Sequence, residues 1–273
     1  MNSLGIMQGR LSASEAGRFQ FFPTEEWSAE FAIAKELGFD HIQWFLDRDI
    51  PDFDPIRDIW LDAAILEKID RAGEIVPISS VDCGRYCMFG TEAAISLEAF
   101  RAMFPALSGR LSTGVVSIPL LEDHAPKTAE QKKEALHTIG VLAAIAEPLG
   151  VRIALETEMP ANELTLFVDS LCMKNVGVCY DLGNTVSYGF NAPAEISALQ
   201  HRIFEVHLKD RKKGTTQSLL LGTGDADFAA CFTALAEIGY TGVYTLQAWR
   251  GDDYRADAIT QRAFVKRLLA NCT

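Results

Sequence analysis

The chain has 273 residues, with 25 basic and 37 acidic side chains, a formal net charge of −12 and a pI near 4.9. This acidity argues against binding nucleic acid through its phosphates, which requires a basic surface. Apolar residues make up 48% of the chain, enough for a large core, and no apolar run approaches the roughly 18 residues needed to cross a bilayer. We therefore expect a soluble globular protein with neither nucleic-acid nor membrane partners.

The start of the chain and its cysteines point to a reducing compartment. Residues 1–11 contain neither the basic nor the apolar segment of a secretory signal. The six cysteines are scattered without a CxxC pair, which predicts buried free thiols and a cytoplasmic location. They are Cys83, Cys87, Cys172, Cys179, Cys231 and Cys272.

Eight short apolar runs alternate with helix-like segments along the chain. A βαβ unit needs about 30 residues or more, and the spacing of the runs fits such units. Continuous apolar strands between helices indicate a parallel sheet that is covered on both faces. The predicted strands are Leu4–Gln8, His41–Leu46, Ile75–Val81, Gly114–Leu121, Val151–Thr157, Val176–Asp181, Ile203–Lys209 and Val243–Ala248.

Glycines follow several of the helix-like segments and mark where we expect the helices to end. Glycine accepts the left-handed conformation that commonly follows the last helical residue. Asp227 is a predicted N-cap, and Pro148 is expected to end or kink the helix that contains it. The predicted helices are Thr24–Leu37 with a cap at Thr24, Ile56–Ala72 ending at Gly73, Thr128–Leu149 ending at Gly150, and Phe228–Ile238 ending at Gly239, with Gly38 after the first.

Eight such units in one chain predict a closed (β/α)₈ TIM barrel that forms a single domain over residues 1–273. The alternative is an open, doubly wound sheet. That fold normally carries a glycine-rich first turn for a dinucleotide, and residues 7–10 contain no GxGxxG motif. We therefore favour the barrel.

Polar side chains stand at the ends of the last four predicted strands: Glu156, Asp181, His207 and Gln247. TIM barrels build their active sites at these carboxyl ends, and adjacent strands lie about 4.8 Å apart, so four tips can surround one ion. Carboxylates with one imidazole suit Mn²⁺, Zn²⁺, Co²⁺ or Mg²⁺. Each residue alone also fits an ordinary role in a loop, turn or core, but their matching placement predicts a metal site. His41 begins a strand at the opposite end, and we assign it no chemistry.

Several motifs make nearly the whole chain resemble the xylose isomerase-like TIM barrels, in particular the sugar phosphate isomerase/epimerase branch. They are LGIMQGRL at the start, GFDHIQW, IALE, YDLGN, VHLKD, LGTGDADF and YTLQAWR. The resemblance implies a divalent-metal-dependent isomerase or epimerase that acts on a sugar or sugar phosphate through an enediolate. It implies one ion, Mn²⁺ or Zn²⁺ foremost, held by Glu156, Asp181, His207 and Gln247. Glu156 and Gln247 then occupy the catalytic positions, with Glu156 as the proton-abstracting base.

At strand eight the chain departs from the family pattern, because Gln247 stands where sugar epimerases usually have Glu. Its amide oxygen can still bind a metal, but it cannot carry a proton as a carboxylate does. Epimerisation then lacks its second acid. Candidates for that role near the strand ends are Glu158, His124, Asp82 and Lys209.

Three further departures concern the substrate. Asn162, Asn184 and Lys213 stand where free-ketose 3-epimerases of the family have Glu, His and Arg, which argues against a free ketose. The basic segment 209–214 can attract a sugar phosphate or be a solvated loop. The candidate substrate-binding residues are Asn184, His124, Lys209, Lys213 and Arg250.

Three other functions stay open. An apurinic endonuclease of the same superfamily needs three zinc ions and many histidines, whereas this acidic chain has five. A dehydratase or hydrolase of an inositol-like or keto-acid substrate would use the same metal centre. A non-catalytic sugar or metal binder would explain Gln247 as loss of function. A homo-oligomer is compatible with the sequence.

Overall fold

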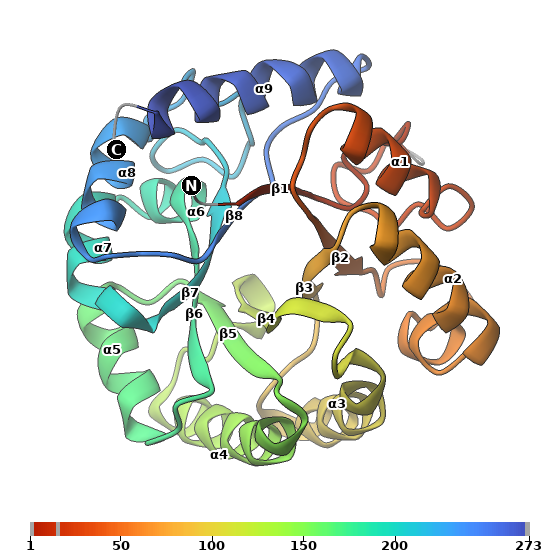
Figure 1. Ribbon diagram of the computed structural model, residues 1–273. Helices are drawn as coiled ribbons and strands as arrows, with labels where there is room; N and C mark the ends of the chain where they lie inside the picture. The colour runs from red at the N-terminus through yellow and green to blue at the C-terminus, as the bar shows by residue number, and fades with distance from the viewer. Residues whose placement is uncertain (1–2, 15–16, 271–273) are drawn as a thin grey trace.

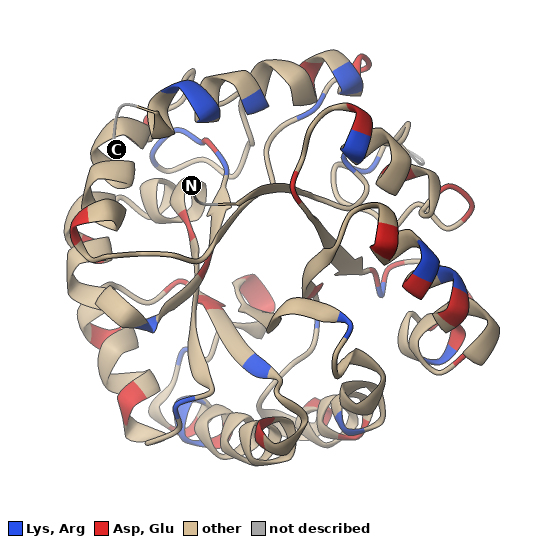
Figure 2. Ribbon diagram, viewed as in Figure 1, with Lys and Arg blue, Asp and Glu red and all other residues tan. Residues whose placement is uncertain are grey.

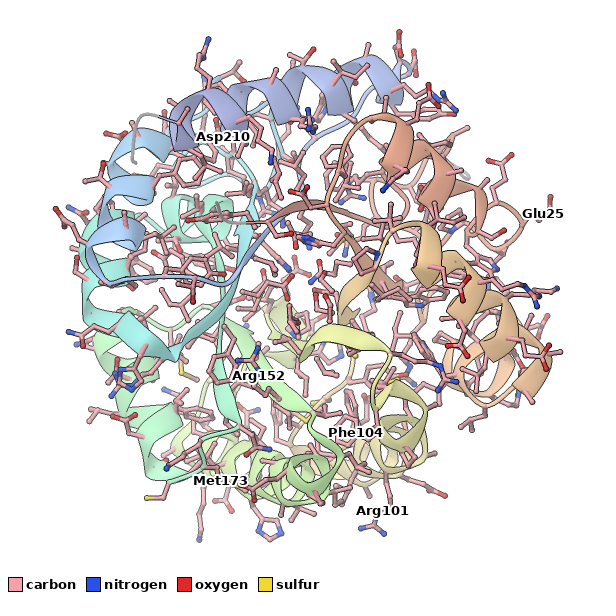
Figure 3. The ribbon with its side chains drawn as sticks, in the orientation of Figure 1. Glu25, Arg101, Phe104, Arg152, Met173 and Asp210 are labelled. Atoms are coloured by element: carbon pink, nitrogen blue, oxygen red, sulfur yellow. The ribbon has the colours of Figure 1, made fainter. Side chains whose placement is uncertain are left out.

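A computed structural model of the chain describes residues 3–14 and 17–270. Eight parallel strands form a closed barrel in which β1 pairs with both β2 and β8, and side chains fill the ring (Figures 1 and 3). The closure confirms the predicted (β/α)₈ TIM barrel over the open sheet. The strands are β1 (Leu4–Met7), β2 (Ile42–Leu46), β3 (Ile78–Cys83), β4 (Leu111–Leu120), β5 (Arg152–Thr157), β6 (Val176–Asp181), β7 (Ile203–Leu208) and β8 (Val243–Leu246).

Helices surround the barrel, with acidic and basic residues mixed on α1 and α2 (Figures 1 and 2). No helix in the described ranges is both long and apolar enough to cross a membrane. A π-helix at Ile56–Trp60 and short 3₁₀ turns, including Glu122–His124 and Glu147–Leu149, lie between the main elements. The α-helices are α1 (Ala29–Glu36), α2 (Ala63–Ile75), α3 (Ala93–Leu107), α4 (Ala129–Ala146), α5 (Ala161–Ser170), α6 (Leu182–Ser187), α7 (Ala192–Leu199), α8 (Phe228–Glu237) and α9 (Tyr254–Leu269).

Glycine ends the helical segments at three of the four predicted places. Gly38, Gly150 and Gly239 have φ angles of 77°, 70° and 69°. Gly73 instead lies inside α2, which continues to Ile75, so β3 begins later than predicted. The physical reason is Pro77, because a residue before proline disfavours the helical conformation, and Val76 is extended.

Other predicted helix boundaries also shift. Thr24 does not cap α1, which begins at Ala29. The segment predicted as one helix over 56–72 is a π-helix followed by α2, whose N-cap Asp62 accepts a hydrogen bond from the Ile65 amide. Asp227 caps α8 as predicted, accepting from the Ala230 amide. Pro148 lies in a 3₁₀ turn directly after α4, as expected for a residue that ends a helix.

The thiols follow the prediction with one exception. Four described cysteines are buried and free, whereas Cys172 is exposed between α5 and β6, where its side chain lies outside the core. Cys272 lies outside the described residues. The four buried cysteines are Cys83, Cys87, Cys179 and Cys231.

A polar cluster fills the barrel interior below the strand ends. Its centre is the fully buried Glu205 of β7, which the sequence did not single out. Burial raises the pKa of Glu205 to about 7, although the hydrogen bonds that it accepts act in the opposite direction. Because the donors come from β2, β3, β4 and β8, the carboxyl group links five strands. They are Gln43 Nε2 at 2.9 Å, Ser80 Oγ at 2.9 Å, Thr245 Oγ1 at 2.8 Å and Ser117 Oγ at 3.3 Å.

His41 lies next to the start of β2, at the opposite end of the barrel from the strand tips, as predicted. It is buried, with Nδ1 2.9 Å from Ser3 Oγ and Nε2 3.4 Å from Thr245 Oγ1. Burial lowers the pKa of His41 from 6.5 to about 4, against the opposing charge of Asp40. The folded protein therefore keeps this ring neutral where the unfolded chain protonates it.

This shift predicts a loss of stability in acid. The contribution of His41 is fully present above pH 6.5 and is lost as the pH falls toward 4, by about 3 kcal/mol in total. The free energy of unfolding of the wild type, measured by urea unfolding, should therefore fall over this window relative to that of His41→Gln. His137→Gln, on an exposed part of α4, is the control and should leave the pH profile unchanged. Parallel profiles for wild type and His41→Gln would contradict the prediction.

Candidate active site at the carboxyl ends of the strands

A cavity of about 430 Å³ opens at the carboxyl ends of the barrel strands. Besides His124, five residues named from the sequence line it, four of them from the ends of β3, β5, β7 and β8 and one from α6. His124 lines it from the 3₁₀ turn after β4. The tertiary structure therefore brings together most of the side chains that sequence placed at strand tips. The five residues are Asp82, Glu156, Asn184, Lys209 and Gln247.

Glu156 and His207 form the centre of the site. Glu156 Oε2 lies 3.6 Å from His207 Nδ1, and both side chains are buried. Glu156 Oε1 accepts a hydrogen bond from the side-chain amide of Asn184. Burial, and secondarily the charge of Asp181, raises the pKa of Glu156 well above its usual value. A carboxyl group in this state is a stronger base than one in water.

The imidazole of His207 contacts the polar cluster in the barrel interior. Its Nε2 lies 2.9 Å from Gln43 Nε2, and Gln43 is in turn bound to Glu205. Burial lowers the pKa of His207 to about 4, against the opposing charge of Asp181, so the ring is neutral near pH 7. Neutral imidazole is the form that binds metals.

Asp181 has two partners in the structure. Its Oδ1 accepts from the Asn184 amide at 2.8 Å and caps α6, and its Oδ2 lies 2.9 Å from Lys209 Nζ. Burial would raise the pKa of Asp181, but Lys209, His207 and the hydrogen bond from the Asn184 amide together outweigh burial, so the pKa lies below its usual value. Asp181 is thus both a helix cap and the partner of a buried lysine.

Gln247 follows β8 and is buried, and its side-chain oxygen Oε1 has no hydrogen-bond partner among the described residues. His207 Nδ1 is likewise buried without a hydrogen-bond partner. Buried oxygen and nitrogen atoms normally have partners, and a cation would satisfy the Gln247 oxygen and, in the tautomer whose Nδ1 carries no proton, the His207 nitrogen. Together with the Glu156 carboxylate, this donor set fits a divalent metal.

A further side chain, Cys179, lies against the same centre. Ligand atoms of Glu156, Cys179 and His207 all lie within 4.8 Å of one another. Cys179 is two residues before Asp181 on β6, so strand alternation places both on the inner face, a signal present in the sequence. Burial raises the pKa of this thiol well above its usual value.

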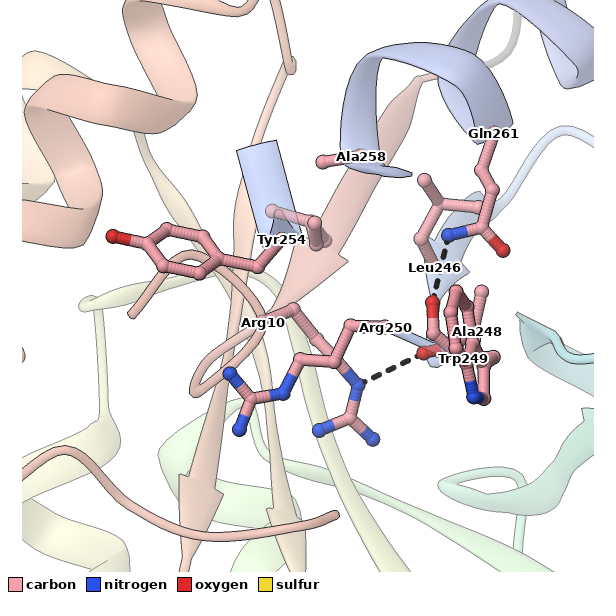
Figure 4. Close-up of a pocket in the computed structure, with 9 residues that line it drawn as sticks. Arg10, Leu246, Ala248, Trp249, Arg250, Tyr254, Ala258 and Gln261 are labelled. Carbon is pink, nitrogen blue, oxygen red and sulfur yellow. Dashed lines mark hydrogen bonds between the residues drawn. The ribbon is translucent and has the colours of Figure 1, made fainter. Parts of the chain in front are cut away.

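Two predicted substrate-binding residues lie elsewhere. Lys213 is exposed and does not line the cavity. Arg250 lies beside Arg10 in a separate small pocket, with its guanidinium over the Phe21 ring at 4.6 Å, while Arg10 donates to the Ala248 carbonyl (Figure 4). Besides Lys209, the residue of the basic segment that reaches the cavity is Arg211, which has a buried Nε without a hydrogen-bond partner in the described chain.

Asp210, the last residue of the VHLKD motif, holds the LGTGDADF segment in place (Figure 3). Its Oδ2 accepts from the amides of Gly222 and Gly224, both at 2.8 Å, and its Oδ1 accepts from Ala226 at 3.2 Å. A Cβ on Gly224 would lie 2.2 Å from Oδ1, so this position requires glycine. The two motifs are therefore one structural unit, whose amides bind a carboxylate of the chain itself.

Replacing Asp210 with Asn tests this unit. The new NH₂ group would face amide donors, which leaves buried polar groups unsatisfied at a cost of about 1–3 kcal/mol. We expect a corresponding loss in the free energy of unfolding and faster hydrogen exchange at Gly222 and Gly224. Asp252→Asn, at an exposed position, is the matched control. Unchanged exchange at both glycines in Asp210→Asn would show that other contacts hold the loop.

Comparison with known proteins gives the family. The family model described as xylose isomerase-like TIM barrel matches residues 31–268, so the chain belongs to that family. The L-ribulose-5-phosphate 3-epimerase UlaE of Shigella sonnei is 24% identical over 285 residues, covering 98% of this chain and 95% of that protein.

Solved structures share the fold. An L-ribulose 3-epimerase superposes with a TM-score of 0.76 at 19% identity, covering all of this chain and 96% of that one. The IolI protein with a bound zinc atom gives 0.76 at 18% identity, covering 99% of both chains. A Mycobacterium smegmatis protein of this type in complex with magnesium gives 0.73 at 17% identity, covering 98% and 97%.

Proposed function

We propose that the chain is a divalent-metal-dependent epimerase or isomerase of a ketose phosphate. The observation that carries the proposal is the buried Glu156–His207 pair at the strand ends, beside a cavity and an unpartnered Gln247 oxygen. The nearly full-length match to L-ribulose-5-phosphate 3-epimerases supports sugar chemistry.

The phosphate is supported by the basic side chains of the cavity. Arg18, Arg85, Lys209 and Arg211 line it within a chain of net charge −12. Arg85 also pairs with Asp49 at 3.0 Å, and Lys209 pairs with Asp181, whereas the buried Nε of Arg211 lacks a hydrogen-bond partner in the described structure. A planar guanidinium suits a phosphate group, so Arg211 is the proposed anion contact in place of Lys213.

Glu156, His207 and Gln247 would hold the metal, and Asp181 would join them on leaving Lys209. The metal would supply Lewis acidity that stabilises negative charge on the substrate carbonyl oxygen. Solved structures of the same fold with zinc or magnesium bound support the proposal of a divalent ion.

Proton transfer is the work of Glu156. The Asn184 amide holds its Oε1, and its raised pKa suits abstraction of a proton from the carbon beside the carbonyl near neutral pH. The electron pair moves into an enediolate. Return of the proton to the neighbouring carbon gives isomerisation, whereas protonation from the opposite face gives epimerisation.

Glu156→Gln should abolish turnover while preserving the fold. Loss of a general base costs about 10²–10⁴-fold in rate. The kcat for L-ribulose 5-phosphate should therefore fall by at least about a hundredfold, and the same measurement is made with unphosphorylated L-ribulose for comparison. Glu147→Gln, at an exposed 3₁₀ turn, is the control. A kcat equal to wild type in Glu156→Gln would rule out Glu156 as the base.

Gln247 provides a test of metal binding that does not depend on turnover. Gln247→Glu adds a negative charge beside the donor set and should tighten Mn²⁺ binding by roughly tenfold, about 1.4 kcal/mol. Gln247→Leu removes the side-chain oxygen and should weaken Mn²⁺ binding. The affinity of each variant for Mn²⁺ is measured by isothermal titration calorimetry. Equal Mn²⁺ affinity in wild type and Gln247→Leu would remove Gln247 from the ligand set.

A further inference from the structure

Asp82, one residue before the end of β3, is a buried carboxylate without partners. It is 1% exposed, and neither carboxylate oxygen has a hydrogen-bond partner among the described residues. Three buried carboxylates that do not line this cavity, Glu30, Glu205 and Asp210, each accept at least three hydrogen bonds. Because an unpartnered buried acid is costly, its retention beside a cavity points to a ligand or a reaction.

The barrel register brings Asp82 and Glu156 into the same cavity from different strands. Asp82 pairs with Ser117 of β4, and Ser117 pairs with Ala154 of β5. Ala154 and Glu156 lie on the same face of β5, two residues apart. One strand therefore separates the two acids, and both line the cavity.

The other candidates for the second acid are engaged or lie at the rim. Lys209 is paired with Asp181. Glu158 accepts a hydrogen bond from the Glu122 amide. His124 is only half buried, in a 3₁₀ turn. Asp82 alone among the four combines complete burial with unoccupied oxygens.

The protonation state of Asp82 is consistent with such a role. Burial and the charge of Glu205 raise the pKa of Asp82 to about 7, while Lys209 acts to lower it. A group in this range can both donate and accept a proton near neutral pH.

We propose that Asp82 is a catalytic residue, the acid that protonates the substrate carbon on the face opposite Glu156, in place of the strand-eight carboxylate that Gln247 lacks. The assignment rests on the proposed function. Glu156 takes the proton from the substrate carbon, and the C–H electron pair enters the enediolate double bond. That double bond then takes the proton of Asp82 on its other face. Glu156 ends protonated and Asp82 ionised, and exchange with water restores both. In the reverse direction Asp82 is the base.

The test follows the two directions of the reaction in D₂O, with the Mn²⁺-loaded full chain and either L-ribulose 5-phosphate or its C3 epimer. Asp82→Asn should lose net conversion by at least about a hundredfold. It should still incorporate deuterium into recovered L-ribulose 5-phosphate, through Glu156, but not into the epimer. Glu156→Gln should show the reciprocal pattern, exchanging the epimer only.

Several controls make the outcomes decisive. Asp82→Asn is nearly isosteric, and wild-type circular dichroism and Mn²⁺ affinity would show that the site is intact. Asp123→Asn, exposed beside the cavity turn, should behave as wild type. Wild-type conversion by Asp82→Asn would overturn the assignment, as would equal loss of exchange with both epimers in that variant. So would loss of conversion in His124→Gln with exchange kept only in L-ribulose 5-phosphate. Absence of both exchange and conversion in the wild type would instead refute the proposed function, and this assignment with it.

Discussion

Glu156 and His207 are held 3.6 Å apart in a buried place, and the rest of the site depends on this contact. Burial disfavours charge, so the carboxyl group becomes more basic and the imidazole stays neutral. Neither group would have these properties at an exposed loop. Asn184 occupies one oxygen of Glu156, which leaves the other facing His207. Burial in the barrel thus gives two ordinary side chains the basicity and the neutral ring that the proposed base and the proposed metal ligand require.

The Glu156–His207 contact is supported by a second layer of polar side chains around Glu205, below the strand ends. Glu205 accepts hydrogen bonds from donors on four other strands, and Gln43 links it to the His207 ring. Partners of this kind fix the orientation of an imidazole ligand. The layer also satisfies a carboxyl group that would otherwise be costly to bury. Stability and function therefore share the same buried hydrogen bonds.

The loops around the site are also held by buried carboxylates that accept hydrogen bonds from backbone amides. Asp210 binds three backbone amides of the LGTGDADF segment, and Asp181 caps α6. Both carboxylates satisfy amides that the barrel topology leaves unpaired at the ends of strands and helices. The loop geometry then places Lys209 and Arg211 at the cavity, while Lys213 stays exposed.

The sequence by itself determined the eight-stranded barrel and which residues stand at the strand ends, because these depend on local hydrophobic patterns and strand alternation. It also located Asp227 and most of the helix-ending glycines, whose roles are local. It misplaced the end of α2, where Pro77 and not Gly73 stops the helix. Only the tertiary structure decided that Asp181 pairs with Lys209, that Gln43 and Glu205 support His207, and that Asp82 accepts no hydrogen bond from any described residue. Those relations join strands far apart in the chain, and they depend on barrel register and side-chain packing, which no local pattern encodes.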